Sequence, residues 1–87
     1  MFNPRGMKGR NMTIFVEYNG ISTDTDELIG EIVGRHGGTI VGSGFGFGTR
    51  DLEIEFLSRD EAYRAFDTLL DHREQNRWDW RVRLRCE

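Results

Sequence analysis

The sequence predicts an α+β domain in which strands and helices follow the order strand–helix–strand–strand–helix–strand. Two observations support this fold class: four segments alternate between apolar and polar residues, and two others carry apolar residues at helical spacing. A length of 87 residues fits one domain. We expect one antiparallel four-stranded sheet in the spatial order 4-1-3-2, with both helices on one face.

The first strand is expected at residues 12–18, which are rich in β-branched and aromatic residues and end at the turn signal Asn19-Gly20. Alternation places Phe15 and Glu17 on one side of this strand. Three residues would face the core from the other side: Ile14, Val16 and Tyr18.

The first helix is expected to begin at Asp24, because Glu27 follows three residues later in the spacing of a capping box. Gly37-Gly38 predicts its end. Between these signals, four apolar residues recur at helical spacing: Leu28, Ile29, Ile32 and Val33.

The second strand should start at residues 39–41 and continue into the run Gly-Ser-Gly-Phe-Gly-Phe-Gly at 42–48. Within a strand, this run would leave one side as bare backbone. The opposite side would carry four residues: Val41, Ser43, Phe45 and Phe47. Glycine at such positions indicates a bend, a bulge or the close approach of a ligand or another chain.

The third strand is expected at residues 51–57 and the second helix after Ser58, which forms a capping-box spacing with Glu61. Asn76 would close this helix. The strand buries Leu52, Ile54 and Phe56, and the helix presents an apolar stripe: Ala62, Ala65, Phe66, Leu69 and Leu70. The fourth strand, from residue 78, would turn five residues inward: Trp78, Trp80, Val82, Leu84 and Cys86.

This order of elements resembles the ferredoxin-like split β-α-β arrangement, which leaves one sheet face uncovered. The uncovered face would display a basic strand (Arg81, Arg83, Arg85), a central strand (Thr13, Phe15, Glu17) and an acidic strand (Asp51, Glu53, Glu55). Exposed rows of charge are commonly only solvated. A contact surface for a partner or for another copy of the chain is the alternative.

Two families with this topology show similarities to the chain. Residues 14–19 resemble the first-strand motif of RNA-recognition modules, and residues 54–65 resemble their third strand and second helix. That family stacks bases on aromatic residues of the third strand. The matching outward positions are Asp51 and Glu53, whose carboxylates repel phosphate, so nucleic acid is not the expected partner.

The second similarity is to trimeric PII-like proteins, on the residues Gly44-Phe45-Gly46 followed by the strand at 52–56. It implies an oligomer with residues 42–50 at a subunit boundary, where a small nucleotide or metabolite could bind. The long loop of that family is replaced here by a few residues around 46–50.

Catalytic and metal-binding motifs are weak. His36 and His72 fall near helix ends, and Cys86 is the only cysteine, so no metal-ligand spacing joins them. Unshifted pKa values are expected for five carboxylates on the helix cap and the exposed strand face: Asp24, Asp26, Glu27, Glu53 and Glu55. We therefore expect no catalytic residues, no metal and no cofactor. The alternative is an enzyme whose site is assembled between subunits.

A net charge of −3 also argues against a dedicated nucleic-acid binder. The single cysteine and the absence of an apolar spanning run favour a cytoplasmic protein without membrane contact. Residues 1–11 are unpatterned, so we expect a disordered leader before a natural start at Met12.

The favoured function is a small regulatory protein-binding domain of bacterial or phage accessory or inhibitor type. Its partner would be another protein or a second or third copy of this chain. The candidate binding residues lie in the glycine-rich hairpin and on the adjoining face: Gly42, Ser43, Gly44, Phe45, Gly46, Phe47, Gly48, Arg50 and Asp51, with Phe15, Arg81 and Arg83.

Overall fold

The computed structural model describes residues 12–86, which form the expected sequence of strands and helices. In chain order the elements are β1 (Met12–Asn19), α2 (Thr23–Arg35), β2 (Thr39–Gly46), β3 (Thr49–Phe56), α3 (Arg59–Asn76) and β4 (Arg81–Cys86). The predicted order of elements is confirmed. The prediction of a disordered leader at residues 1–11 lies outside the described residues.

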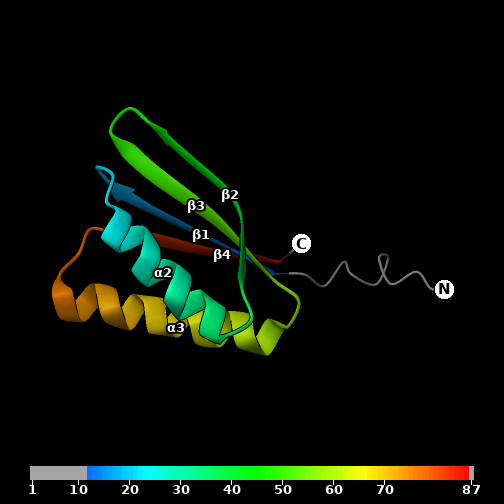
Figure 1. The fold of residues 1–87 in the computed structure, drawn as a ribbon. Helices are drawn as coiled ribbons and strands as arrows, with labels where there is room; N and C mark the ends of the chain where they lie inside the picture. Colours follow the sequence, from blue (N-terminus) through cyan, green and yellow to red (C-terminus); the bar gives the residue numbers. More distant parts are fainter. Residues whose placement is uncertain (1–11, 87) are drawn as a thin grey trace.

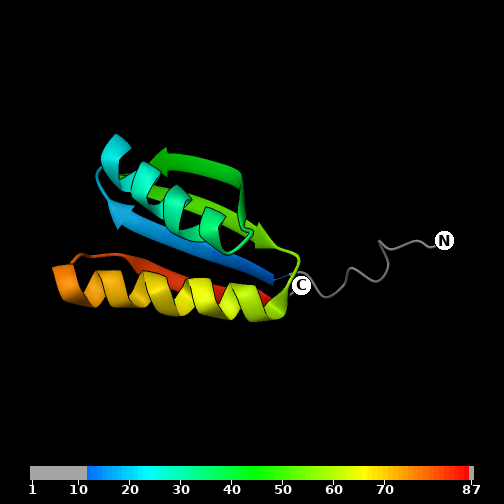
Figure 2. The ribbon, with the colours of Figure 1, turned by 60° about the horizontal axis from the view of Figure 1, so that its bottom comes forward.

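The strands form one sheet in the order β2-β3-β1-β4, in which all neighbours are antiparallel. This is the predicted order read from the opposite edge. Both helices lie on the same face of the sheet (Figures 1 and 2), an α+β arrangement consistent with the ferredoxin-like one. None of the helices found within residues 12–86 has the length and apolar character needed to cross a membrane.

The hydrophobic core lies between the sheet and the helices. The inward rows of β1 and β3 are almost completely buried, as predicted: Ile14, Val16, Tyr18, Leu52, Ile54 and Phe56. The helices bury three residues each: Ile29, Ile32, Val33, Ala62, Ala65 and Leu69. Each large apolar side chain that is removed from water contributes about 1.5–3 kcal/mol to folding.

The start of α2 differs from the prediction. Ser22 is the N-cap residue: its backbone is extended and its Oγ accepts a hydrogen bond from the Thr25 N–H at 3.2 Å. The expected capping box of Asp24 and Glu27 is therefore wrong, because the chain is already helical at these residues. The end of α2 agrees with the prediction, since Gly37 follows with a φ of +76°.

The start of α3 is as expected, with the Ser58 Oγ accepting from the Glu61 N–H at 3.3 Å. Its end is one residue later than expected. Asn76 is still helical, and Arg77 closes the helix with a φ of +56°. A left-handed residue at this place is usually glycine, so Arg77 occupies a strained position.

The glycine run is not one regular strand. A bulge between Ile40 and Gly42 shifts the register of β2 against β3, and the strand ends at Gly46. Phe47 and Gly48 then form a two-residue turn, with φ values of +54° and +78°. Two left-handed residues are characteristic of a type I′ hairpin turn. The expectation that Phe47 would share a strand side with Val41, Ser43 and Phe45 is thus wrong.

The fourth strand is shorter than predicted, because it begins at Arg81. Trp80 is buried just before it, whereas Trp78 is 38% exposed and stacks on Trp80 with a ring-centroid separation of 4.8 Å. Cys86 was expected to face the core but is exposed. It ends an edge strand whose other inward residues, Val82 and Leu84, are only partly buried.

Candidate functional site

The face of the sheet that the helices leave uncovered, here called the open face, has one chemical character per strand. The register aligns three rows across β3, β1 and β4: Glu55–Thr13–Arg85, Glu53–Phe15–Arg83 and Asp51–Glu17–Arg81. An acidic strand therefore lies on one side of β1 and a basic strand on the other. This is the predicted arrangement of the open face.

The basic side of the open face is engaged with β1. The guanidinium carbons of Arg83 and Arg85 lie 5.3 Å and 4.9 Å from the centroid of the Phe15 ring. Arg81 Nε lies 3.4 Å from Glu17 Oε1, and Arg83 Nη2 lies 4.0 Å from Glu17 Oε2. Exposed pairs of this kind each contribute only about 0–1 kcal/mol, but they hold the arginines in place over β1.

The acidic side is different. The side chains of Asp51 and Glu53 form no hydrogen bond or ion pair with any residue that the structure describes. Both carboxylates instead lean over β2. A Cβ atom added to Gly44 would lie 3.3 Å from both carboxylate oxygens of Asp51, and one added to Gly42 would lie 3.4 Å from Glu53 Oε1. The alternate glycines therefore leave room for two uncompensated carboxylates.

The tip of the hairpin, residues 45–49, carries exposed aromatic rings. Phe47 is fully exposed, and Phe45 is 52% exposed. The Gly48 carbonyl accepts a hydrogen bond of 2.7 Å from the Gly20 N–H, so the tip adjoins the loop that follows β1. Ile21 in that loop is also exposed. Three apolar side chains thus stand near one end of the sheet.

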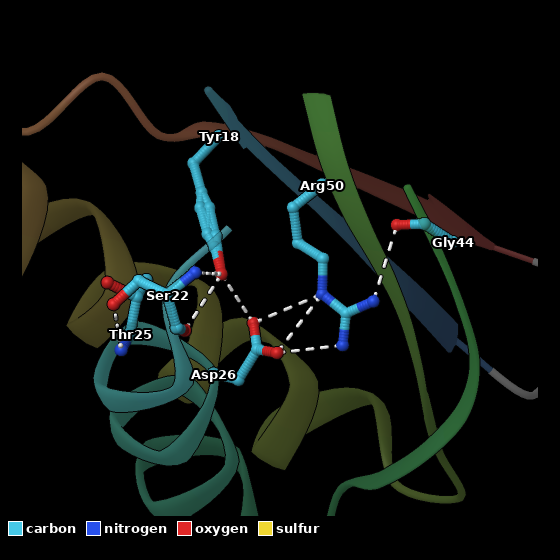
Figure 3. Close-up of polar contacts among 6 residues, drawn as sticks. All are labelled: Tyr18, Ser22, Thr25, Asp26, Gly44 and Arg50. Carbon is cyan, nitrogen blue, oxygen red and sulfur yellow. Dashed lines mark hydrogen bonds and ion pairs between the residues drawn. The ribbon is translucent and has the colours of Figure 1, made fainter. Parts of the chain in front are cut away.

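A polar cluster fixes the root of the hairpin to the start of α2 (Figure 3). Arg50 Nη2 donates to Asp26 Oδ2 at 2.7 Å, and Arg50 Nε donates to the same oxygen at 3.0 Å. Arg50 Nη1 lies 3.5 Å from the Gly44 carbonyl. The Tyr18 hydroxyl donates to Asp26 Oδ1 at 2.6 Å and accepts from the Ser22 N–H at 3.2 Å. The cluster therefore connects β1, α2 and both strands of the hairpin.

The cluster shifts the pKa values of its members. Burial alone would raise the pKa of Asp26, but the hydrogen bonds from Arg50 and Tyr18 outweigh it and hold that pKa below its usual value. The pKa of Tyr18 is raised by burial and by its hydrogen bond to Asp26. The expectation that the acids near the start of α2 titrate normally is therefore wrong for Asp26.

The sequence contains one signal for this cluster, the position of Arg50 within β3. Leu52 and Ile54 face the core, so alternation also turns Arg50 to the helix side of β3. A guanidinium on that side needs an acid within reach. Asp26 could not be chosen from sequence alone, because it depends on how α2 lies over the sheet.

The predicted binding residues thus separate by face. The open face contains most of them: Phe15, Arg81, Arg83 and Asp51, together with the strand glycines Gly42, Gly44 and Gly46. Ser43 and Phe45 pair with Leu52 and Arg50 and lie on the helix side of β2. Phe47 and Gly48 form the two-residue turn within the tip. The structure brings the hairpin residues together, while Arg81 and Arg83 lie two strands away from β3.

Within residues 12–86, no three His, Cys, Asp or Glu side chains lie where they could together hold a metal ion. His36, which follows the last residue of α2, places Nδ1 3.1 Å from Glu61 Oε1 and so links the two helices. Its side chain is partly buried.

The geometry is therefore that of a sheet whose open face carries two uncompensated acids on β3, beside the glycine-rich edge strand β2, and whose hairpin ends in an exposed aromatic residue. Comparison with models of known protein families finds no match, and a search of curated proteins finds no significantly similar sequence.

Proposed function

We propose that this chain is a non-enzymatic protein-binding domain that contacts its partner through the hairpin at residues 42–51. One observation carries the proposal: Phe47 is fully exposed in a left-handed backbone conformation at the first central position of the turn. Asn, Asp or Gly suits this position best. A bulky residue there is strained, and its ring gains nothing from burial in the free domain.

The surroundings of Phe47 support a binding role. Aromatic side chains are favoured as energetic centres of protein interfaces, and Phe45 and Ile21 extend the apolar surface. Arg50 and Asp26 hold the root of the hairpin against α2. A binding element that is held in place before association loses less conformational entropy when the complex forms.

Other functions receive less support from the geometry. An RNA-recognition module needs aromatic residues on the outward positions of β3, and this strand presents Asp51 and Glu53 there. Enzymatic activity needs a nucleophile or base with an orienting partner. Asp26, the acid in the polar cluster, has both carboxylate oxygens hydrogen-bonded within the fold, one to Tyr18 and one to Arg50.

The test is affinity capture from an extract of the source cells, followed by mass spectrometry. The wild type is compared with Phe45→Ala/Phe47→Ala and with Leu57→Ala, which removes an exposed apolar side chain outside the hairpin. The proposal expects proteins that the wild type and Leu57→Ala retain and the double variant loses. Identical protein sets for all three, with the double variant folded by circular dichroism, would refute it.

A further inference from the structure

We propose that the outer edge of β2 accepts an extended segment of a partner protein as a fifth strand, and that this segment carries basic residues at alternate positions. This inference rests on the proposed function, because it specifies how the hairpin binds and what its partner presents. Three features of β2 support it: a free edge, a bare open side with acids behind it, and an apolar helix side.

The edge of β2 is available for pairing. β2 lies at the end of the sheet, and no further strand within residues 12–86 pairs with it (Figure 1). The bulge disturbs its first part, which leaves residues 42–46 as the regular stretch. In a two-residue hairpin, the residues that flank the turn, here Gly46 and Thr49, are hydrogen-bonded to each other through their backbones. Hydrogen-bonded and non-bonded pairs then alternate along the strands, so the N–H and C=O groups of Ser43 and Phe45 point away from β3. Such groups are the template for strand addition.

Gly42 and Gly44 explain why the added strand should carry basic residues. Strands in a sheet lie about 4.8 Å apart, so a fifth strand would lie roughly 10 Å from β3. Side chains of the intervening strand normally occupy this space. Gly42 and Gly44 leave it empty, and Asp51 and Glu53 already lean into it. Lys or Arg side chains on the open side of the added strand can therefore reach both carboxylates.

The opposite side of β2 determines the remaining residues of the segment. Ile40 and Phe45 lie on the helix side and are 41% and 52% exposed. Apolar or β-branched side chains of the added strand would cover them. The occupant is therefore an extended segment in which basic and apolar residues alternate.

This chain contains such a pattern in β4, from Arg81 to Arg85. A second copy is nevertheless not the occupant that we infer. Arg81 and Arg83 are already paired with Glu17, and Arg83 and Arg85 also cover Phe15. Docking through β4 would have to break these contacts, whereas a separate basic segment would not.

The test uses a synthetic peptide, acetyl-Thr-Arg-Val-Arg-Val-Arg-Thr-amide, and amide exchange measured by NMR. Binding is expected to protect the N–H groups of Ser43 and Phe45, while that of Gly44, which points toward β3, changes little. The same peptide with its backbone N-methylated at alternate residues keeps the charge but cannot pair as a strand. This N-methylated peptide should not protect the N–H groups of Ser43 and Phe45 from exchange.

Protein variants test the charges. Asp51→Asn/Glu53→Gln should weaken peptide binding about tenfold. Asp67→Asn/Asp71→Asn is the matched control, because it removes the same charge from exposed positions of α3. The inference is overturned if both double variants bind equally, if the N-methylated peptide binds as well, or if the protein self-associates at this edge in a manner that Asp51→Asn/Glu53→Gln abolishes.

The result is distinguishable from failure of the proposed function. If captured proteins depend on Phe45 and Phe47 but not on Asp51 and Glu53, the protein-binding role stands and strand addition is wrong. If capture depends on none of these residues, the protein-binding role itself fails.

Discussion

Replacing Phe47 by asparagine should stabilise the domain while it removes the aromatic tip. Phe47 has a φ of +54°, a region that costs an ordinary residue about 1–2 kcal/mol. Asparagine tolerates this region, and Asn-Gly is the preferred pair for a two-residue hairpin turn. Because the ring of Phe47 is fully exposed, its removal sacrifices no buried area. We therefore expect the free energy of unfolding to rise by about 1 kcal/mol.

For a domain of this size, such a gain raises Tm by about 4–8 °C. Thermal and urea unfolding followed by circular dichroism would measure it. Phe47→Ala separates strain from side-chain loss, because alanine is equally disfavoured at this φ and should leave Tm almost unchanged. Leu57→Asn is the matched control for placing asparagine at an exposed apolar position whose φ is not left-handed. The reasoning is refuted if Phe47→Asn has the same or lower stability than the wild type.

Three further predictions concern the fold. Asp26→Asn should lower the unfolding free energy by about 1.5–3 kcal/mol at pH 7. Because the folded-state pKa of Asp26 is lowered, its stabilising contribution is complete above the ordinary pKa of the carboxyl group and is lost as the pH falls through the folded-state pKa. The stability of Asp26→Asn should therefore fall less steeply with decreasing pH than that of the wild type. An equally steep fall would contradict this. Gly38→Ala should lower the free energy of unfolding, measured in urea, by about 1–3 kcal/mol, because the new Cβ would lie 2.6 Å from the buried Phe56 ring. Gly30→Ala is the control: its Cβ would make only an ordinary contact of 3.8 Å with Ile40, so the variant should be as stable as the wild type or more stable. Arg77→Gly should raise Tm by a few degrees, as the left-handed residue that ends α3 becomes glycine, and a lower Tm would show that the Arg77 side chain matters more than its φ.

Most of the fold was predictable because local signals agreed with one another. Alternation identified the buried rows of β1 and β3, and the helical stripes identified the residues that cover them. Ser58 and Gly37 marked helix ends correctly. These signals depend on near neighbours in the chain, which is why sequence alone could reveal them.

The remaining features depend on tertiary structure. Ser22 and Asp24 are both acceptable N-cap residues, and only the path of the chain after β1 selects Ser22. The bulge near Val41 follows from how β2 and β3 fit together. The ion pair between Arg50 and Asp26 likewise depends on tertiary structure, because the two residues are distant in sequence. For the candidate site, the glycine run and both phenylalanines were predictable, but the turn at Phe47 and the uncompensated state of Asp51 and Glu53 were not.

The pairing of Met12 with Cys86 has a practical consequence for handling the domain. The two ends of the described chain lie side by side at one end of the sheet, and the hairpin turn lies at the other (Figure 1). A fluorescent fusion, a surface tether or a host loop could therefore be joined at either end without approaching Phe47. A short linker between these ends would also permit circular permutation, with new termini opened between Phe47 and Gly48. Such a permuted domain would keep its sheet strands and lose only the continuity of the turn.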